Sequence, residues 1–256
     1  MTELLRLLIE YNASIADKAE IAALVFLRIG AAVATLPAFG ETTIPARIRL
    51  VLALMLSSAI FPAVQDDLQS VSLQQGFAPE VAIGLGLGLM IRLFVLSLMT
   101  AGSIASNATS LSQLFPSGAE AQPALSKLLV AAGLAIAMKA GLHLRIVDYL
   151  ILGYRLLPAG LWPSPSLMAD WGIAQIARSF SMAFMISMPF VIASLIYNVA
   201  LGVINRAMPQ LMVTFVGAPA LSLGGLVLIG LVTPVALAIW LEALNSFLAI
   251  PTAPIR

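Results

Sequence analysis

The sequence predicts an all-α integral membrane protein with about six long, partly kinked apolar helices. Hydrophobic residues make up 61% of the 256 residues and charged residues only 10%, whereas a soluble domain carries about 25% charged residues. Apolar stretches of the length needed to cross a hydrocarbon core of about 30 Å recur along the chain. Prolines and glycines interrupt the longest of them. The length suits a single membrane domain over residues 1–256.

The expected elements follow in chain order. Residues 1–11 carry leucines separated by polar residues, which is typical of a short amphipathic helix lying along an interface. This segment lacks the basic start and cleavage site of a secretory signal, so we expect the mature protein to keep it. The six expected spans are residues 21–36, 48–64, 81–105, 125–157, 173–204 and 211–250. Segments rich in Pro, Gly or polar residues are the expected loops: 37–45, 65–79, 107–123 and 158–170.

The last stretch is longer than one crossing needs. About 40 residues would extend about 60 Å as a straight helix, twice the hydrocarbon thickness. The stretch contains Pro219, Gly224, Gly225 and Pro234, so we expect it to be broken, kinked, folded back or extended beyond the bilayer. Pro189 interrupts the preceding stretch. Such interruptions are tolerated where protein neighbours satisfy the freed carbonyls, which favours burial within an assembly.

Composition excludes several kinds of site. The chain has no cysteine and a single histidine, which excludes disulfides, cysteine nucleophiles and a multi-histidine metal site. The net charge of +1 gives no electrostatic basis for binding nucleic acid. Gly84, Gly86 and Gly88 lack the spacing of a nucleotide-binding loop. Gly84 and Gly88 instead fit a GxxxG pair, which permits close helix packing.

Three basic residues lie inside apolar stretches, namely Arg28, Arg92 and Lys139. Each would cost about 2.5–3.5 kcal/mol at the centre of a membrane helix. Structural pairing or snorkelling to the interface is the more frequent role of such charges. A line of charges along a conduit or a proton path is the functional alternative.

Two motifs resemble those of a known family. Residues 201–225 read LGVINRAMPQLMVTFVGAPALSLGG, and residues 27–54 read LRIGAAVATLPAFGETTIPARIRLVLAL. Both resemble the most distinctive stretches of the FliR family of flagellar export-gate proteins, whose injectisome counterpart is called SctT. The matching positions are Gly202, Arg206, Pro209, Gln210, Gly217, Pro219 and Gly225 in the first motif, and Pro37, Phe39, Gly40, Ile44, Pro45, Arg47 and Arg49 in the second. The resemblance covers nearly the whole chain, although residues 108–123 match only loosely.

The resemblance implies a fold and a function. Proteins similar to FliR contribute one copy to a helical gate that also contains several copies of FliP and FliQ. Residues 1–165 would then form a FliP-like part, and residues 166–256 a FliQ-like hairpin. Gly202, Arg206, Pro209 and Gln210 would form a partner contact at the tip of that hairpin. The implied protein is a non-enzymatic type III secretion subunit without cofactor or metal.

The resemblance also implies a location and partners. The gate lies in the bacterial inner membrane at the flagellar basal body, surrounded by lipid, with FlhB and FlhA as further partners. Unfolded flagellar proteins pass through it, and nucleic acid has no role.

The resemblance further implies a pore plug in the loop between the third and fourth spans. Mapped onto this chain, the loop covers about residues 110–122. The plug residues would be Leu114, Phe115, Pro116, Ser117 and Gly118. The segment has a bulky apolar centre flanked by Pro and Gly, which suits a movable plug. An ordinary surface loop is the interpretation that the residues alone favour.

Two other functions stay open. A secondary transporter would build a midplane site from broken helices and would ideally show internal repeats, which the sequence lacks. An intramembrane hydrolase would need a serine facing His143, and replacing His143 with alanine would then abolish its activity. His143 lies close to Arg145 and Asp148, which can pair at i, i+3, so a polar residue at a helix end is its simpler interpretation.

Overall fold

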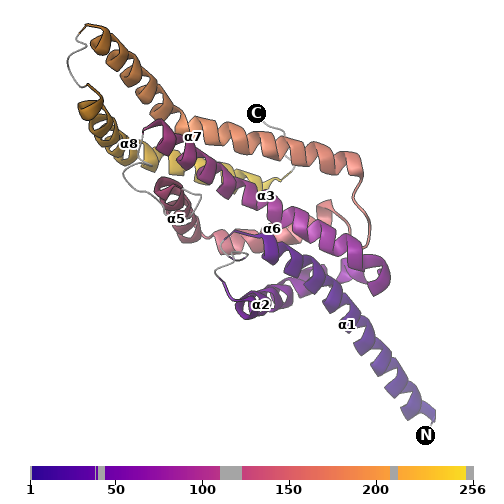
Figure 1. Cartoon of the computed structure of the whole chain (residues 1–256). Helices are drawn as coiled ribbons and strands as arrows, with labels where there is room; N and C mark the ends of the chain where they lie inside the picture. Colours follow the sequence, from indigo (N-terminus) through magenta and orange to yellow (C-terminus); the bar gives the residue numbers. More distant parts are fainter. Residues whose placement is uncertain (1, 38, 40–43, 110–122, 208–212, 252–256) are drawn as a thin grey trace. The chain divides into compact units, whose positions relative to one another are not determined.

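The computed structural model describes the chain except residues 1, 38, 40–43, 110–122, 208–212 and 252–256. The described part is helical and contains no strand, which confirms the predicted all-α class (Figure 1). Its elements are α1 (Thr2–Thr35), α2 (Ala46–Val64), the 3-10 turn η1 (Gln65–Leu68), α3 (Leu73–Ala108), α5 (Ala124–Lys139), α6 (Leu142–Leu156), α7 (Pro165–Ala207) and α8 (Val213–Ala249).

Four helical segments of the described chain are long and apolar enough to cross a membrane: α2 with η1, α3, α7, and Pro219–Ala249 of α8. Together α5 and α6 meet the same criterion, which makes five if this bent pair is one span. The predicted number of six is therefore approximate. Residues 2–11 of the amphipathic segment and residues 21–35 of the first apolar stretch are parts of one continuous helix, α1.

The predicted stretch 125–157 is not one straight helix, because the chain turns by 79° between α5 and α6. Gly141 adopts a φ of 86° at this point, a conformation that is open to glycine but strained for residues with a Cβ. The backbone N–H groups of Ala140 and Gly141 donate to the carbonyls of Ile136 and Met138, which closes the end of α5.

Two predicted loops are shorter in the structure than in the prediction. Within the segment 65–79, η1 covers the first four residues and α3 begins at Leu73, with Pro79 inside the helix. Within 158–170, α7 begins at Pro165. Proline fits the first position of a helix because its missing N–H would have no helical partner there. The prolines were interpreted as breakers although one of them starts a helix.

The longest predicted span, residues 211–250, contains a single helix, α8. α8 runs from Val213 to Ala249 with Pro219 and Pro234 inside it, and α7 contains Pro189 in the same way. The 37 residues of α8 extend about 56 Å at about 1.5 Å per residue. Within these bounds α8 neither breaks nor folds back, and its length exceeds a hydrocarbon core of about 30 Å.

The chain divides into two compact units. The first contains Met1–Arg92 and Leu142–Gly172, and the second contains Leu93–Gly141 and Ile173–Arg256. The largest fully buried side chains of the first unit are Leu24, Arg28, Ile29, Leu36, Ile60, Leu68, Ile83, Leu87, Ile91 and Tyr149. Those of the second are Trp240 and Phe247.

Close helix packing in the second unit centres on Trp240 of α8. Its indole Nε1–H donates to the carbonyl of Phe94 at 2.8 Å, and the ring of Phe94 lies 5.2 Å from that of Phe247.

The helices α3 and α5 are also in close contact in this unit. Ser126 of α5 donates from its hydroxyl to the carbonyl of Met99 at 2.9 Å. A Cβ on Gly102 would lie 2.5 Å from the Cα of Ser126, so α3 and α5 touch at backbone distance.

The GxxxG pair of α3 packs closely on another helix, as predicted, and that helix is α1 of the first unit. A Cβ added to Gly84 would collide with the carbonyl oxygen of Arg28, and one added to Gly88 would collide with Oγ1 of Thr35. A Cβ on Gly86 would meet nothing within 4 Å. The two glycines of the pair therefore permit the backbones of α1 and α3 to approach, whereas Gly86 does not contribute to this contact.

Gly84→Ala should destabilise the first unit by about 1–3 kcal/mol, because the methyl group forces α1 and α3 apart. Gly86→Ala is the matched control on the same helix. It should be neutral or stabilising by up to about 1 kcal/mol, because alanine favours helix over glycine. Thermal unfolding of the purified chain in a mild detergent measures both. Equal melting temperatures for the two variants would contradict the packing assigned to Gly84.

Candidate functional site

A buried ion pair is the most polar feature inside the described structure. Arg28 of α1 and Glu80 of α3 both have fully buried side chains. Arg28 Nε lies 2.6 Å from Oε2 of Glu80, and Nη2 lies 2.8 Å from Oε1, so the guanidinium and the carboxylate meet in parallel bonds. This bidentate geometry is the strongest form of an Arg–carboxylate contact.

Further contacts complete this Arg28–Glu80 cluster, which we define as Arg28, Glu80, Tyr154 and Gly160. Nη1 of Arg28 donates to the carbonyl of Leu157 at 3.0 Å. The backbone N–H of Gly160 donates to Oε1 of Glu80 at 2.9 Å. The guanidinium carbon lies 3.9 Å from the centre of the Tyr154 ring, which adds a cation–π contact. The cluster thus joins α1, α3, α6 and the turn after α6.

The geometry of the cluster fits a structural role. Each guanidinium nitrogen of Arg28 donates to a protein acceptor, and the carboxylate of Glu80 accepts in turn from Gly160. A buried charge of either sign alone would carry a desolvation penalty of several kcal/mol, which pairing and added hydrogen bonds offset. Among the described residues no group of three or more His, Cys, Asp or Glu could hold a metal.

Glu80 is the functional residue that sequence reasoning missed. It lies directly before the apolar stretch 81–105, at the edge of a predicted loop, so it was assigned no partner. Glu80 and Gly84 are spaced i, i+4 and share one face of α3. Gly84 meets the backbone of Arg28 on that face. A carboxylate one turn before a packing glycine therefore indicates the partner of Arg28, but only once α1 is known to pack on that face.

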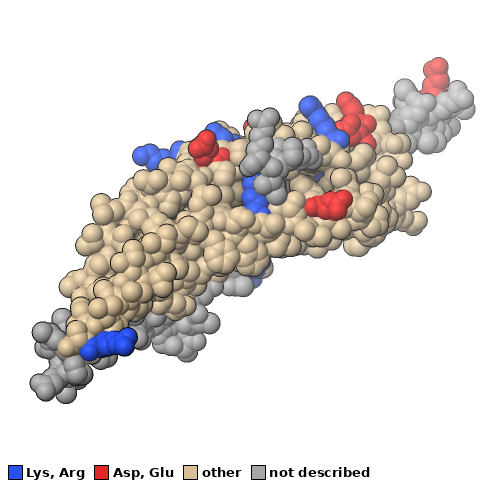
Figure 2. Space-filling view, turned by 90° about the horizontal axis from the view of Figure 1, so that it is seen from above, with Lys and Arg blue, Asp and Glu red and all other residues tan. Residues whose placement is uncertain are grey.

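The other two predicted intramembrane charges have different surroundings. Arg92 is partly exposed on α3, and Lys139 is exposed in the last turn of α5. His143 is exposed on α6. Figure 2 shows how sparse charged side chains are on the face that it presents, as expected for a chain covered by apolar neighbours.

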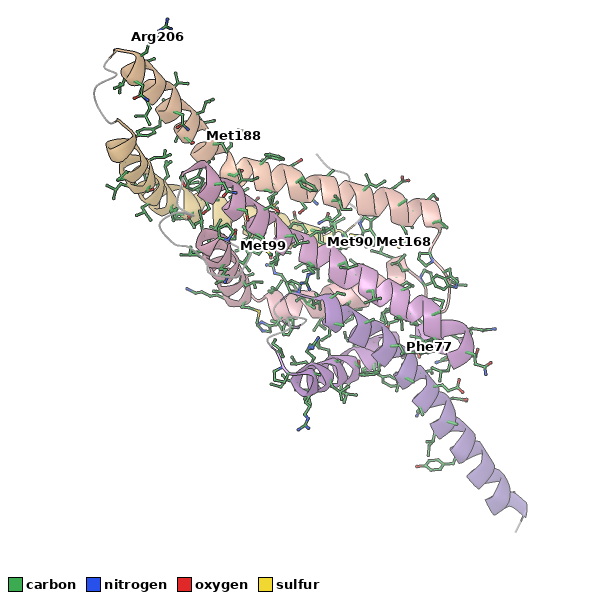
Figure 3. The ribbon with its side chains drawn as sticks, in the orientation of Figure 1. Phe77, Met90, Met99, Met168, Met188 and Arg206 are labelled. Carbon is green, nitrogen blue, oxygen red and sulfur yellow. The ribbon has the colours of Figure 1, made fainter. Side chains whose placement is uncertain are left out.

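The predicted hairpin-tip residues are partly described. Gly202 and Arg206 are exposed near the C-terminal end of α7, and the side chain of Arg206 extends away from the helix (Figure 3). Pro209 and Gln210 lie outside the described residues. Exposed apolar side chains recur at intervals of three or four residues along α7: Ile173, Ile176, Phe180, Phe184, Met188, Val191, Leu195, Val199 and Val203. We call this set the α7 stripe.

All the predicted plug residues, Leu114, Phe115, Pro116, Ser117 and Gly118, lie outside the described residues. The segment that carries them follows Ala108, the end of α3, and precedes Ala124, the start of α5. Both flanking helix ends belong to the second unit.

Comparison with known proteins gives consistent matches. The family model described as bacterial export proteins, family 1, matches residues 20–247. Flagellar biosynthetic protein FliR of Caulobacter vibrioides is 33% identical over 240 residues, which cover 91% of this chain and 96% of that protein. The FliR proteins of Escherichia coli and Aquifex aeolicus are 27% and 29% identical over 220 and 215 residues. These two matches cover 81% and 82% of this chain, and 82% and 83% of those proteins.

Proposed function

The chain belongs to the bacterial export proteins, family 1, and we therefore propose that it is a non-enzymatic subunit of the flagellar protein-export gate. The observation that carries this proposal is the match between the family model and residues 20–247 of the chain. Relatives named flagellar biosynthetic protein FliR support it. The gate would lie in the bacterial inner membrane at the flagellar basal body. Unfolded flagellar proteins would be its cargo.

The proposed assembly joins one copy of this chain to FliP and FliQ, with FlhB and FlhA nearby. Residues 1–165 would be the FliP-like part, and residues 166–256 the FliQ-like hairpin, which contains α8 and all of α7 after Pro165. The α7 stripe supports a role among other subunits, because only 22% of the most apolar window of α7 is buried within the chain. Neighbouring helices would cover such a surface by close packing.

Co-expression with FliP and FliQ, purification in detergent and native mass spectrometry test the proposal. A stable complex with one copy of this chain is the expected result. A chain that purifies alone or as a homo-oligomer would overturn the proposal. Solute flux by that isolated chain in liposomes would then favour the secondary transporter.

Arg206→Ala should weaken the complex, because it removes the exposed charge at the end of α7 that we assign to partner contact. We expect at least a tenfold loss of co-purified FliQ and a smaller swimming halo, from about 1.4 kcal/mol of lost contact energy. Arg155→Ala is the matched control, since Arg155 is also exposed and in the last turn of its helix. Full assembly and motility of Arg206→Ala would refute the role given to this position.

Deleting residues 114–117 should make the assembled gate leak ions, because apolar side chains can close a pore by excluding water. The leak is measured as loss of membrane potential in cells that express the three proposed gate proteins. Ser112→Ala in the same segment is the control and should not alter the potential. An unchanged potential in the deletion variant would remove the plug assignment.

A further inference from the structure

We propose that the groove between α1 and α2 binds an anionic phospholipid, with its phosphate at Arg49 and one acyl chain along the two helices. The site goes beyond the proposed export function and needs no export partner. All its residues belong to the first compact unit.

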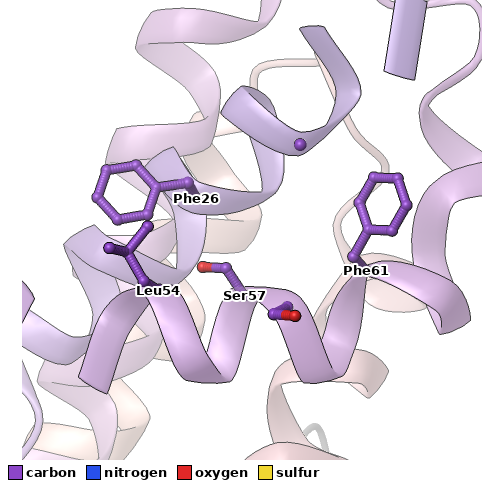
Figure 4. Close-up of a pocket in the computed structure, with 6 residues that line it drawn as sticks. Phe26, Leu54, Ser57 and Phe61 are labelled. Atoms are coloured by element: carbon purple, nitrogen blue, oxygen red, sulfur yellow. The ribbon is translucent and has the colours of Figure 1, made fainter. Parts of the chain in front are cut away.

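The groove consists of two adjoining hollows that share Phe26 as a wall. One has a volume of about 310 Å³ and lies between α1 and the later part of α2, where Leu54, Ser57 and Phe61 line it (Figure 4). The other has a volume of about 460 Å³ and lies toward the start of α2. Its lining is apolar apart from Arg49. We take the two hollows, which adjoin at Phe26, as one mainly apolar channel with one cation, Arg49, near its end.

The length of this channel suits one acyl chain. The lining residues of α2 run from Ala46 to Phe61, and Arg49 and Phe61 are 12 residues apart, which corresponds to about 18 Å of helix. One leaflet contributes about half of a hydrocarbon core of about 30 Å. An acyl chain whose headgroup lies at Arg49 therefore reaches about as far as Phe61.

Arg49 provides the charge for the headgroup. Its Nε is buried and makes no hydrogen bond to any described residue, and the described residues that line the two hollows include no acidic side chain. A buried charged donor without an acceptor is costly, and a phosphate oxygen is a strong acceptor for a guanidinium. Arg49 also lies in the first turn of α2, where the helix dipole favours an anion.

The surroundings favour a lipid over a water-soluble anion. α2 with η1 is one of the segments apolar enough to cross a membrane, and Ile48, Val51 and Met55 on α2 are exposed. An apolar channel with a cation at one end has the same polarity pattern as a phospholipid. Basic pockets between membrane helices recognise anionic headgroups in this way.

Native mass spectrometry of the full chain in mild detergent, titrated with phosphatidylglycerol, tests the site. We expect Arg49→Gln to raise the dissociation constant about tenfold. The matched control Arg47→Gln, an exposed arginine on the same turn that lines neither hollow, should change it less than twofold. Wild-type protein should bind phosphatidylcholine more weakly than phosphatidylglycerol. Equal losses in the two arginine variants, or no loss in Arg49→Gln, would overturn the proposal.

Gly30→Leu tests the groove independently of charge. Gly30 lines the larger hollow, and a Cβ there would lie 3.8 Å from the Phe26 ring, an ordinary contact. The leucine side chain should fill the channel and abolish phosphatidylglycerol binding while Arg49 is retained. Undiminished binding would refute the site, as would competition by soluble glycerol phosphate at equal concentration.

A phosphatidylglycerol with a photoreactive acyl chain tests the groove in membranes that contain the export partners. We expect cross-links at Leu54 and Phe61 that disappear in Arg49→Gln. A partner peptide cross-linked there in place of the lipid would show a protein interface and would overturn the proposal.

Discussion

Glu80→Leu should destabilise the first compact unit by about 3–5 kcal/mol, because it leaves the Arg28 guanidinium buried without a counter-charge. Arg28→Met should have a similar cost, since it leaves the carboxylate of Glu80 with only the backbone N–H of Gly160 as a donor. Both side chains have no exposed surface, so water cannot replace the lost partner. Urea unfolding of the purified chain in detergent measures each loss.

The double variant Arg28→Met, Glu80→Leu separates pairing from packing. A buried pair replaced by apolar side chains of similar volume is often neutral or even stabilising. We therefore expect the double variant to be more stable than either single variant, with a coupling energy of about 2 kcal/mol or more. Asp67→Asn, an exposed acid in η1, is the control and should change stability by less than about 0.5 kcal/mol. Additive losses would contradict the pairing.

Trp240→Ala should destabilise the second unit by about 3–5 kcal/mol. Trp240 is a fully buried side chain, and alanine leaves a cavity the size of an indole ring. The substitution also removes the donor to the carbonyl of Phe94. Trp240→Phe should cost less, because it refills part of the cavity but does not restore the hydrogen bond. Thermal unfolding compares the two variants.

Trp162→Ala is the control for this series, because Trp162 is 66% exposed and belongs to the first unit. We expect it to change the melting temperature little. If Trp240→Ala and Trp162→Ala were equally stable, the core position assigned to Trp240 would be wrong.

The sequence predicted the helical class well because apolar composition and span length follow directly from the chemistry of the bilayer. The boundaries of the helices were harder to predict than the fold class. A single glycine such as Gly141 is compatible with a helix interior, and only its positive φ in the folded chain reveals the bend. The sequence places Pro165 and Pro79 in loops, yet each lies within a helix. Pro165 is the first residue of α7, where proline is tolerated, whereas Pro79 lies inside α3.

The candidate sites were predicted less completely. Pairing was the more frequent role expected for Arg28, but its partner lies 52 residues away in Glu80. No local pattern encodes such a distance. The i, i+4 relation between Glu80 and Gly84 becomes informative only when α1 is known to pack on that face. The groove at Arg49 likewise arises where α1 and α2 lie side by side, so the sequence of either helix alone does not predict it.

The α7 stripe has a consequence for the life of the protein in the cell. α7 contains 43 residues and extends about 65 Å, more than twice the hydrocarbon thickness. If α7 stands across a bilayer, part of its apolar surface lies outside the lipid. A copy synthesised in excess of its partners would keep an apolar surface that is exposed until other subunits cover it. Cellular proteases remove such chains, so we expect the abundance of this subunit to follow that of its partners rather than its own rate of synthesis.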